Sequence, residues 1–452
     1  MKKLTVGVLC AGVVAAAGVL ATSYYSGIKI QEAFEQNAQA WSAEDGFSVE
    51  VLEYERGWIR SHAKTLWSFA GEEEFHEIQV THDMLHGPWP MGKAAKVISR
   101  FLLPESSEPQ LVDALQSRAP LEWTTIANWS GQTTHTLASP QFAATFQDGS
   151  TLVWGGLQAQ WDLSAERNHA KGFMRMPELR VQVEDGSVMD VDNAEFTFDT
   201  AIPEGHGFWV GPTMLNIGAM DVQDTESQTY LKLQKLAVQA GNTLQEGLLQ
   251  SSLGLQLAQL QTQAYNVNNV ALNMQLKHVN ALWFDQFIHW MQAGSDIQNM
   301  PWLNSLPQLL AGKPEISVSE LTMDSEDGPI SLSARLAYVG TQPEAFNPLG
   351  DLEGQLQTEM PMSALAMMLE SKVRNDYLEL LEQMNHDLEE AQLQAAVEDG
   401  LEKRLDTLLG QGVFVVEEMQ AKAALSFTGG ELKLNGQPIA LQNLLSIGGA
   451  LQ

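Results

Sequence analysis

The chain is almost devoid of cysteine, since Cys10 is the only one among 452 residues. The remainder therefore forms no internal disulfide and offers no thiolate to a metal. This excludes a disulfide-rich secreted domain and a cysteine zinc site. Stability must come from the size of the core, and a chain of this length can bury a large one.

Basic residues are also scarce. Lysine and arginine number 25 against 56 aspartates and glutamates, which gives a net charge of -31. Such a field repels phosphate backbones and anionic headgroups, so nucleic-acid binding is excluded as a function. Three explanations of the acidity stay open: a cation-rich habitat, a basic partner, and simple solubility.

One long stretch lacks charge altogether. Leu4–Tyr25 contains no charged residue and directly follows Lys2 and Lys3. As a helix it would reach roughly 33 Å, enough to cross a hydrocarbon core of about 30 Å. Lysines on the short leading side indicate that residues 1–3 stay in the cytoplasm. The sequence thus predicts a transmembrane anchor over residues 4–25, with everything after it outside the cytoplasm.

Two other interpretations of this run stay open. A cleaved signal peptide would place the chain in the same compartment, although the run is longer than a usual signal core. Tyr24 and Tyr25, placed where an interfacial aromatic belt would lie, favour the anchor. A buried helix of a soluble protein is the other alternative. A lipoprotein is excluded, because Leu9 precedes Cys10 where a small residue is required.

Beyond the run, the hydrophobic period changes twice. Residues 26–45 have helical spacing and predict a membrane-proximal helix. From residue 46, apolar and polar residues alternate in short segments separated by turn residues, which predicts antiparallel strands with local connections. The clearest hairpin pairs Ile316–Met323 with Ile330–Leu336.

Helical spacing returns in two later segments, and the second carries one long apolar stripe that we expect to pack on the sheet, with a break near Gly400. We therefore predict an α+β fold, in which an N-terminal transmembrane helix precedes a large, meander-like antiparallel β-sheet packed against long amphipathic helices. The expected parts are a cytoplasmic stub (1–3), the anchor (4–25), the membrane-proximal helix (26–45), and a periplasmic β-rich domain (46–452) with helical insertions near 281–311 and 363–409.

No motif leads us to assign a catalytic, cofactor-binding or metal-binding residue. The chain lacks a G-x-S-x-G elbow, a P-loop, a dinucleotide fingerprint and a zinc-binding histidine helix. Four Glu-Asp-Gly triplets lack the ligand spacing of a calcium loop and predict turns instead. They begin at Glu44, Glu184, Glu326 and Glu398.

Asp190, Asp192 and Glu195 come closer to a metal-binding array. In a regular strand the two aspartates share one face and Glu195 lies on the other, so the three converge only across a bulge. We interpret them as solvated strand positions. Six histidines stay unassigned, because a Ser-His-Asp site is assembled in space and leaves no local motif: His62, His76, His82, His86, His135 and His169.

Two short patterns are more specific. Tyr54-x-Arg56-Gly57 and His86-Gly87-Pro88-Trp89-Pro90 are typical of structural corners, and an aromatic recognition surface is the alternative. With Gly312-x-Pro314 and Leu434-Asn435-Gly436-Gln437, in this order, they resemble the YdgA-like bacterial inner-membrane proteins over nearly the whole chain. The resemblance implies a periplasm-facing protein of Gram-negative bacteria and supplies no catalytic residues.

We therefore expect a non-enzymatic envelope protein, held at the inner membrane through residues 4–25, that acts by self-association or contact with other envelope proteins. The alternative is a binder or carrier of lipid or another hydrophobic ligand, which a solvent-open apolar groove in the sheet would favour. A hydrolase with a spatially assembled site is the third hypothesis, and a cleft with clustered carboxylates or a Ser-His contact would favour it. We expect no cofactor.

Overall fold

The computed structural model describes residues 21–36, 38, 47–70, 75–88, 92–104, 106–225, 229–263, 265–292, 302–384, 390–440 and 442–443. The chain divides into two compact units. The first comprises Met1–Ile202 and Thr213–Tyr230, and the second comprises Pro203–Pro212 and Leu231–Gln452.

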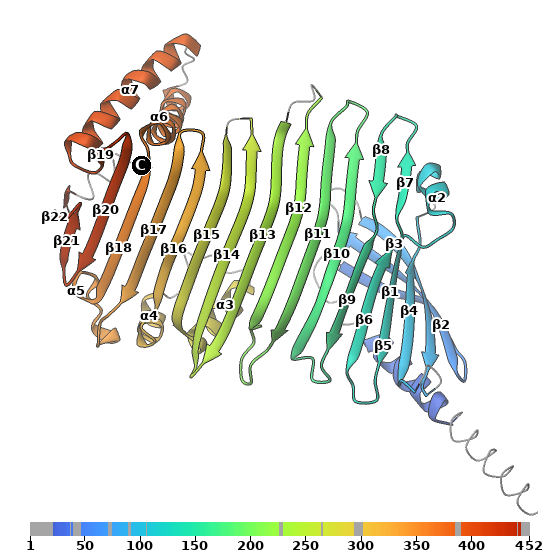
Figure 1. Cartoon of the computed structure of the whole chain (residues 1–452). Helices are drawn as coiled ribbons and strands as arrows, with labels where there is room; N and C mark the ends of the chain where they lie inside the picture. Colours follow the sequence, from blue (N-terminus) through green and yellow to red (C-terminus); the bar gives the residue numbers. More distant parts are fainter. Residues whose placement is uncertain are drawn as a thin grey trace, which may run out of the picture. The chain divides into compact units, whose positions relative to one another are not determined.

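The first unit is an antiparallel sheet that follows the chain (Figure 1). Its elements are β1 (Phe47–Arg56), β2 (Arg60–Ala70), β3 (Phe75–His86), β4 (Ala95–Phe101), α2 (Pro109–Leu115), β5 (Leu121–Ala127), β6 (Thr133–Ser139), β7 (Phe142–Thr145), β8 (Thr151–Trp154), β9 (Leu157–Leu163), β10 (His169–Gln182), β11 (Val188–Ala201) and β12 (Gly211–Gln223). Strands β1 to β6 each pair with the next one. The ladder continues from β6 to β9, β10, β11 and β12, and the short hairpin β7–β8 pairs with the second half of β10.

The second unit is also an antiparallel ladder, with helices inserted between its strands (Figure 1). Its elements are β13 (Thr229–Gln245), β14 (Leu248–Thr262), β15 (Asn266–Asn280), α3 (Ala281–Gln292), α4 (Trp302–Ala311), β16 (Glu315–Ser325), β17 (Gly328–Tyr338), η2 (Pro343–Ala345), α5 (Pro348–Asp351), β18 (Leu352–Pro361), α6 (Met362–Met384), α7 (Glu390–Gly410), β19 (Val415–Glu417), β20 (Gln420–Thr428), β21 (Glu431–Leu434) and β22 (Gln437–Pro438). Strands β13 to β18 pair in order, and β18 pairs with β20. The free side of β20 takes β19 and β21, and β21 pairs with β22.

The predicted antiparallel strands and the predicted hairpin are confirmed. Ile316 pairs with Leu336, Val318 with Ala334, and Met323 with Ile330, as the alternation of the sequence indicates. Every strand pairing recorded in the two units is antiparallel, which follows from the short turns between consecutive segments.

The second unit has small apolar cores where its helices meet the sheet. Helix α3 packs Trp283 against Leu249 and Val279, near the ends of β14 and β15. The first turns of α6 and the last turn of α7 pack on β18 and β20, where Leu408 is fully buried. The rest of α6 and α7 pack on each other.

The prediction of an α+β fold with long helices packed along the sheet is wrong, because most of the described chain is strand and the helices cover little of it. The apolar stripe of α6 explains the error. Its second half, including Val373, packs on Leu393 and Val397 of α7 rather than on the sheet. An apolar stripe requires an apolar partner and does not specify which one. Gly400 does not break this region, since it lies inside α7 with Val373 beside it.

The transmembrane helix of that prediction is not among the helices that the structure describes. No helix in the described part of the chain has both the length and the apolarity to cross a membrane. Residues 4–20 of the predicted anchor lie outside the described residues, and residues 21–36 form a helix, which we call the leading helix.

Substitution of Leu408 tests the core between α7 and the sheet. Because the side chain is fully buried, we expect Leu408→Ala to lower the free energy of unfolding by about 2–5 kcal/mol. Leu380→Ala is the matched control, since Leu380 in α6 is 47% exposed and its loss should change stability by about 0.5 kcal/mol or less. Urea unfolding followed by circular dichroism measures both. Equal effects would contradict the packing described.

Candidate functional site

Buried imidazoles and hydroxyls line one face of the first unit's sheet. Val80, His82, Met84 and His86 alternate along β3 toward this face, and all four are buried. Ser61 of β2 lies 2.9 Å from His86 Nε2. A Ser-His contact would favour a hydrolase. Whether this pair can act on a substrate depends on its hydrogen bonds and on its exposure.

The hydrogen bonds define the tautomer of His86. Its Nδ1 lies 3.4 Å from the carbonyl oxygen of Trp58, and a carbonyl only accepts, so Nδ1 carries the proton. Nε2 then accepts from the Ser61 hydroxyl. A hydrolase has the same donor order, with a carboxylate in the place held here by a backbone carbonyl. Burial holds the pKa of His86 below its usual value, although hydrogen bonds to Trp58 and Ser23 oppose this.

The Ser61–His86 pair has no access to a substrate in this structure. Both side chains are 0% exposed, and the leading helix lies over them. A Cβ added at Gly27 of that helix would stand 2.5 Å from the His86 ring, so only glycine permits this close approach. A hydroxyl sealed in this way cannot meet a reacting carbon, and the pair holds a helix to a sheet.

A second imidazole, that of His82, has a similar arrangement four residues earlier in β3. His82 Nε2 lies 2.9 Å from Thr65 Oγ1 and its Nδ1 lies 2.8 Å from Ser99 Oγ, with Phe34 of the leading helix edge-on to the ring. Burial lowers the pKa of His82 to about 4. A neutral imidazole needs one donor and one acceptor, and two hydroxyls supply both.

His135 on β6 follows the same rule. Thr125 and Thr133 hydroxyls lie 3.0 and 2.9 Å from its two ring nitrogens, and the ring stacks on Trp161 at 5.0 Å. Burial again lowers the pKa of this histidine. The sequence signal that could have found His82 is a histidine flanked by apolar residues at i-2 and i+2 in a strand, here Val80 and Met84.

The charged groups of β2–β4 lie on the opposite face. Asp83 contacts Arg60 and Arg100 at 2.9 Å each and His62 at 2.7 Å. Desolvation acts to raise the pKa of Asp83, but the hydrogen bonds from Arg100 and Arg60 outweigh it and hold the pKa below its usual value. The arginines are about half exposed, so this is a solvated ion-pair cluster.

One more imidazole–carboxylate pair occurs in the second unit. His206 Nδ1 lies 2.6 Å from Asp285 Oδ2, and the backbone N–H of Gly207 donates to Asp285 Oδ1 at 2.8 Å. Asp285 belongs to α3, so the carboxylate ties the segment before β12 to that helix. No local sequence pattern indicates this long-range contact.

The acidic positions predicted as turns and strand positions have mixed outcomes. Glu184 and Glu326 open hairpin turns, with Gly186 and Gly328 at positive φ. The turn predicted at Glu398 is wrong, because the residue lies inside α7. Glu44 lies outside the described residues.

Two of the three acidic residues of the array on β11 are paired with arginines. Asp190 contacts Arg180 and Glu195 contacts Arg175, both across to β10. Within the described ranges, no three His, Cys, Asp or Glu side chains come together as a metal site would require.

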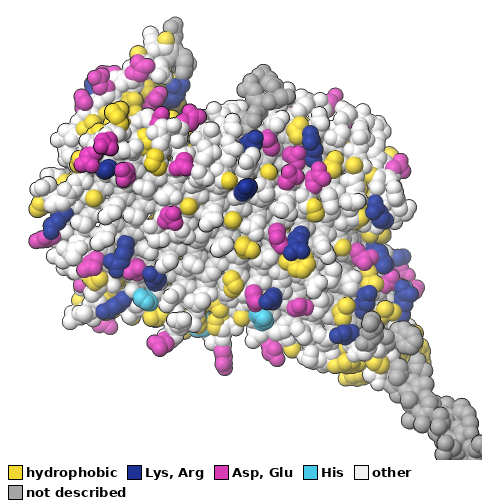
Figure 2. All heavy atoms as spheres, in the orientation of Figure 1, with side chains coloured by type: hydrophobic (Ala, Val, Ile, Leu, Met, Phe, Trp, Pro, Cys, Tyr) yellow, Lys and Arg dark blue, Asp and Glu magenta, His cyan; other side chains and the backbone are white. Residues whose placement is uncertain are grey.

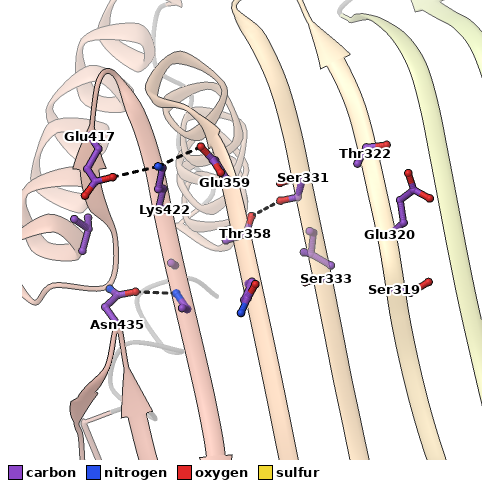
Figure 3. A pocket seen from close by; sticks show the side chains of 15 residues that line it. Ser319, Glu320, Thr322, Ser331, Ser333, Thr358, Glu359, Glu417, Lys422 and Asn435 are labelled. Carbon is purple, nitrogen blue, oxygen red and sulfur yellow. Dashed lines mark hydrogen bonds and ion pairs between the residues drawn. The ribbon is translucent and has the colours of Figure 1, made fainter.

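A shallow polar depression of about 470 Å³ lies on the second unit's sheet (Figure 3). Lys422 of β20 stands between Glu417 at 3.1 Å and Glu359 at 3.4 Å. The Ser331 and Ser333 side chains line its floor. The three charged groups are 41–63% exposed, so water competes for every ion pair. Figure 2 shows acidic and basic side chains scattered among uncharged surface on this face of the molecule, and nothing in the depression activates a nucleophile or a proton.

The fold and these sites define a predominantly antiparallel β protein whose described polar clusters are structural or solvated. The model of the family described as bacterial protein of unknown function (DUF945) matches residues 1–442, and the chain belongs to this family. Membership is compatible with the resemblance to YdgA-like proteins and does not by itself establish it. No curated protein and no solved structure matches the chain.

Substitution of Gly27 tests how the leading helix is held. We expect Gly27→Leu to force the helix off His86, because even a Cβ stands 2.5 Å from the ring. Hydrogen exchange should then speed up at residues 21–36. Ala33→Leu, at an exposed position of the same helix, should leave exchange unchanged. Equal protection in both variants would show that the helix is held elsewhere.

Acid should destabilise the first unit through His82. The folded pKa is about 4, against 6.5 for the unburied group, so the unfolded state binds more protons between these values. The stabilising contribution is present above pH 6.5 and is lost as pH falls toward 4, by roughly 3 kcal/mol in all. Thermal melting across this range measures the loss. It should shrink in His82→Leu and persist in His62→Gln, whose ring is exposed.

Proposed function

We propose that this protein is a non-enzymatic component of the bacterial envelope that acts by self-association through one face of the second unit's sheet. Both main interpretations of Leu4–Tyr25, anchor and signal peptide, place the following residues outside the cytoplasm. The family is bacterial, as a component of the bacterial envelope must be.

The observation that carries the proposal is a continuous apolar face with half-exposed side chains. Directly paired residues cross the sheet in three rows, which we call the apolar face. Two rows run from β14 to β20, Leu253–Met274–Val318–Ala334–Leu356–Leu425 and Leu255–Leu272–Leu321–Leu332–Thr358–Ala423, and one runs from β15 to β20, Leu276–Ile316–Leu336–Gly354–Phe427. Leu276 and Leu425, each at the end of a row, also pack against the helix cores. No row contains a charged residue. Leu253, Ile316, Leu336 and Leu356 are 36–46% exposed.

The extent of the face suits a partner of the same kind. Six strand widths cover about 29 Å and three rows of alternate residues cover about 20 Å, and roughly 500 Å² of this projection remains once the row ends that pack against helices are left out. Two such faces packed as in a β-sandwich would bury about 1,000 Å² in total, near the lower limit for a specific interface. We therefore infer a reversible, concentration-dependent dimer in which the same patch meets itself.

A bound hydrophobic ligand is the second candidate, and the composition of the face favours it. Protein interfaces concentrate Tyr, Trp and Arg at their centres, whereas these rows hold Leu, Ile, Val and Met with Phe427 as the one aromatic residue. An aliphatic surface of this kind would also accept a lipid acyl chain.

Charge placed on the apolar face separates these candidates. We expect Leu336→Asp to abolish the dimer, because a carboxylate at the centre of a dry interface lacks a partner. Leu380→Asp, on a residue of α6 that is 47% exposed, is the matched control and should leave it intact. Native mass spectrometry of protein purified from membranes, over a range of concentrations, measures the mass.

The same spectra report bound lipid. If the wild type is a monomer that carries lipid, and Leu336→Asp loses the lipid, the ligand hypothesis replaces self-association. A wild-type monomer with nothing bound would contradict both. Added salt should strengthen the dimer, because each copy carries a net charge of -31 that opposes association.

A further inference from the structure

Three connections of the first unit meet at one end of its sheet. In an antiparallel ladder the β1–β2, β3–β4 and β5–β6 turns share an end, and backbone bonds join them here. The N–H of His86 donates to the carbonyl of Ile59 at 2.9 Å, and that of Ala94 donates to Ala127 at 2.9 Å. The indole N–H of Trp129 donates to the carbonyl of Gly92 at 2.8 Å. The three turns form one continuous surface.

This surface exposes large aromatic and apolar side chains. Trp58 is 64% exposed, Trp129 is 55% exposed and Ile59 is 37% exposed. The leading helix adds Tyr25, which is 60% exposed, and Tyr24, whose ring lies 5.3 Å from that of Trp58. Trp and Tyr are the residues enriched where a protein meets the interfacial layer of a membrane. Figure 2 shows hydrophobic and basic side chains gathered at the lower right of this view.

The local charge is opposite in sign to that of the chain. Residues 21–28, 56–60, 92–96 and 126–133 contain four basic residues and no Asp or Glu, although acidic residues outnumber basic ones 56 to 25 overall. The four are Arg56, Arg60, Lys93 and Lys96. Arg60 is paired with Asp83. Arg56 stacks on Tyr24, and Lys93 bonds the Asn128 side chain.

The other end of the same sheet is acidic. Its β4–β5 connection carries Glu108 and Asp113 beside the single basic residue Arg118. Charges are screened over about 8–10 Å, so an anionic surface that touches the basic turns senses them rather than the carboxylates at the other end. The charge asymmetry fixes which end can approach such a surface.

The path of the chain leads to the same end. Tyr24 and Tyr25 lie at the start of the leading helix, directly after the uncharged residues 4–20. We infer that the turn surface, formed by Tyr25, Trp58, Ile59 and Trp129 with Arg56, Lys93 and Lys96, docks on the headgroup layer of an anionic phospholipid bilayer. The aromatic rings would enter the interfacial layer, and the basic groups would meet the phosphates.

The test measures how close single positions lie to lipid in the full chain. Cys10→Ala removes the only cysteine, after which Trp129→Cys or Trp58→Cys takes an NBD fluorophore. The protein is mixed with nanodiscs of phosphatidylcholine and phosphatidylglycerol that contain doxyl-labelled phosphatidylcholine. Val112→Cys is the matched control, since Val112 is 45% exposed in α2 within the acidic β4–β5 connection.

We expect quenching at positions 58 and 129 to exceed that at 112 by about threefold or more, because doxyl groups act only at short range in the interfacial layer. Lys93→Glu with Lys96→Glu, or discs of phosphatidylcholine alone, should reduce the quenching at 129. Equal quenching at 112 and 129 would overturn the inference, as would failure of the chain to bind the discs. Quenching that does not change with lipid charge would remove the role of the basic groups.

Discussion

The antiparallel backbone ladder is the constraint on which the rest of this structure depends. Most strands pair with their neighbours in sequence, and side chains are sorted onto two faces by simple alternation. The described helices cover little of the second unit's sheet, and its apolar cores are confined to where α3, α6 and α7 meet strands. Much of this sheet is therefore solvent-accessible on both sides, and the chemistry of each face is decided strand by strand.

The same constraint explains the buried histidines. A polar group on the covered face of a sheet must find partners among the residues that alternate beside it. Thr65 and Ser99 lie on the strands next to His82 and supply both of its hydrogen-bond partners. Ser61 and a backbone carbonyl do the same for His86. A Ser-His contact thus arises from hydrogen-bond satisfaction alone. The contact and its tautomer resemble catalysis, whereas the burial and the helix above it indicate a structural role.

Local order could be read from the sequence, and long-range partners could not. The hairpin of β16 and β17 follows from the alternation at Ile316–Leu336 and the intervening turn. The α6–α7 pairing could not be predicted, because the stripe through Val373 is satisfied equally by a sheet or by a helix. Glu398 reads as a turn only if the helical context of α7 is ignored. The buried histidine sites could not be predicted for a related reason. Their hydroxyl partners lie on neighbouring strands and are set by strand register, which a single sequence does not reveal.

A sheet with this much accessible surface gives the strong acidity of the chain a physical role, because negative charge opposes unwanted association. Strand β1 carries exposed Glu50, Glu53 and Glu55 and a bulge at Leu52, which discourage edge pairing with other chains. A net charge of -31 opposes indiscriminate association of apolar faces. A contact that forms despite this charge needs either a broad apolar area, as on the apolar face, or local basic groups, as on the turn surface. Salt should therefore strengthen association through the apolar face and weaken docking of the turn surface on anionic lipid.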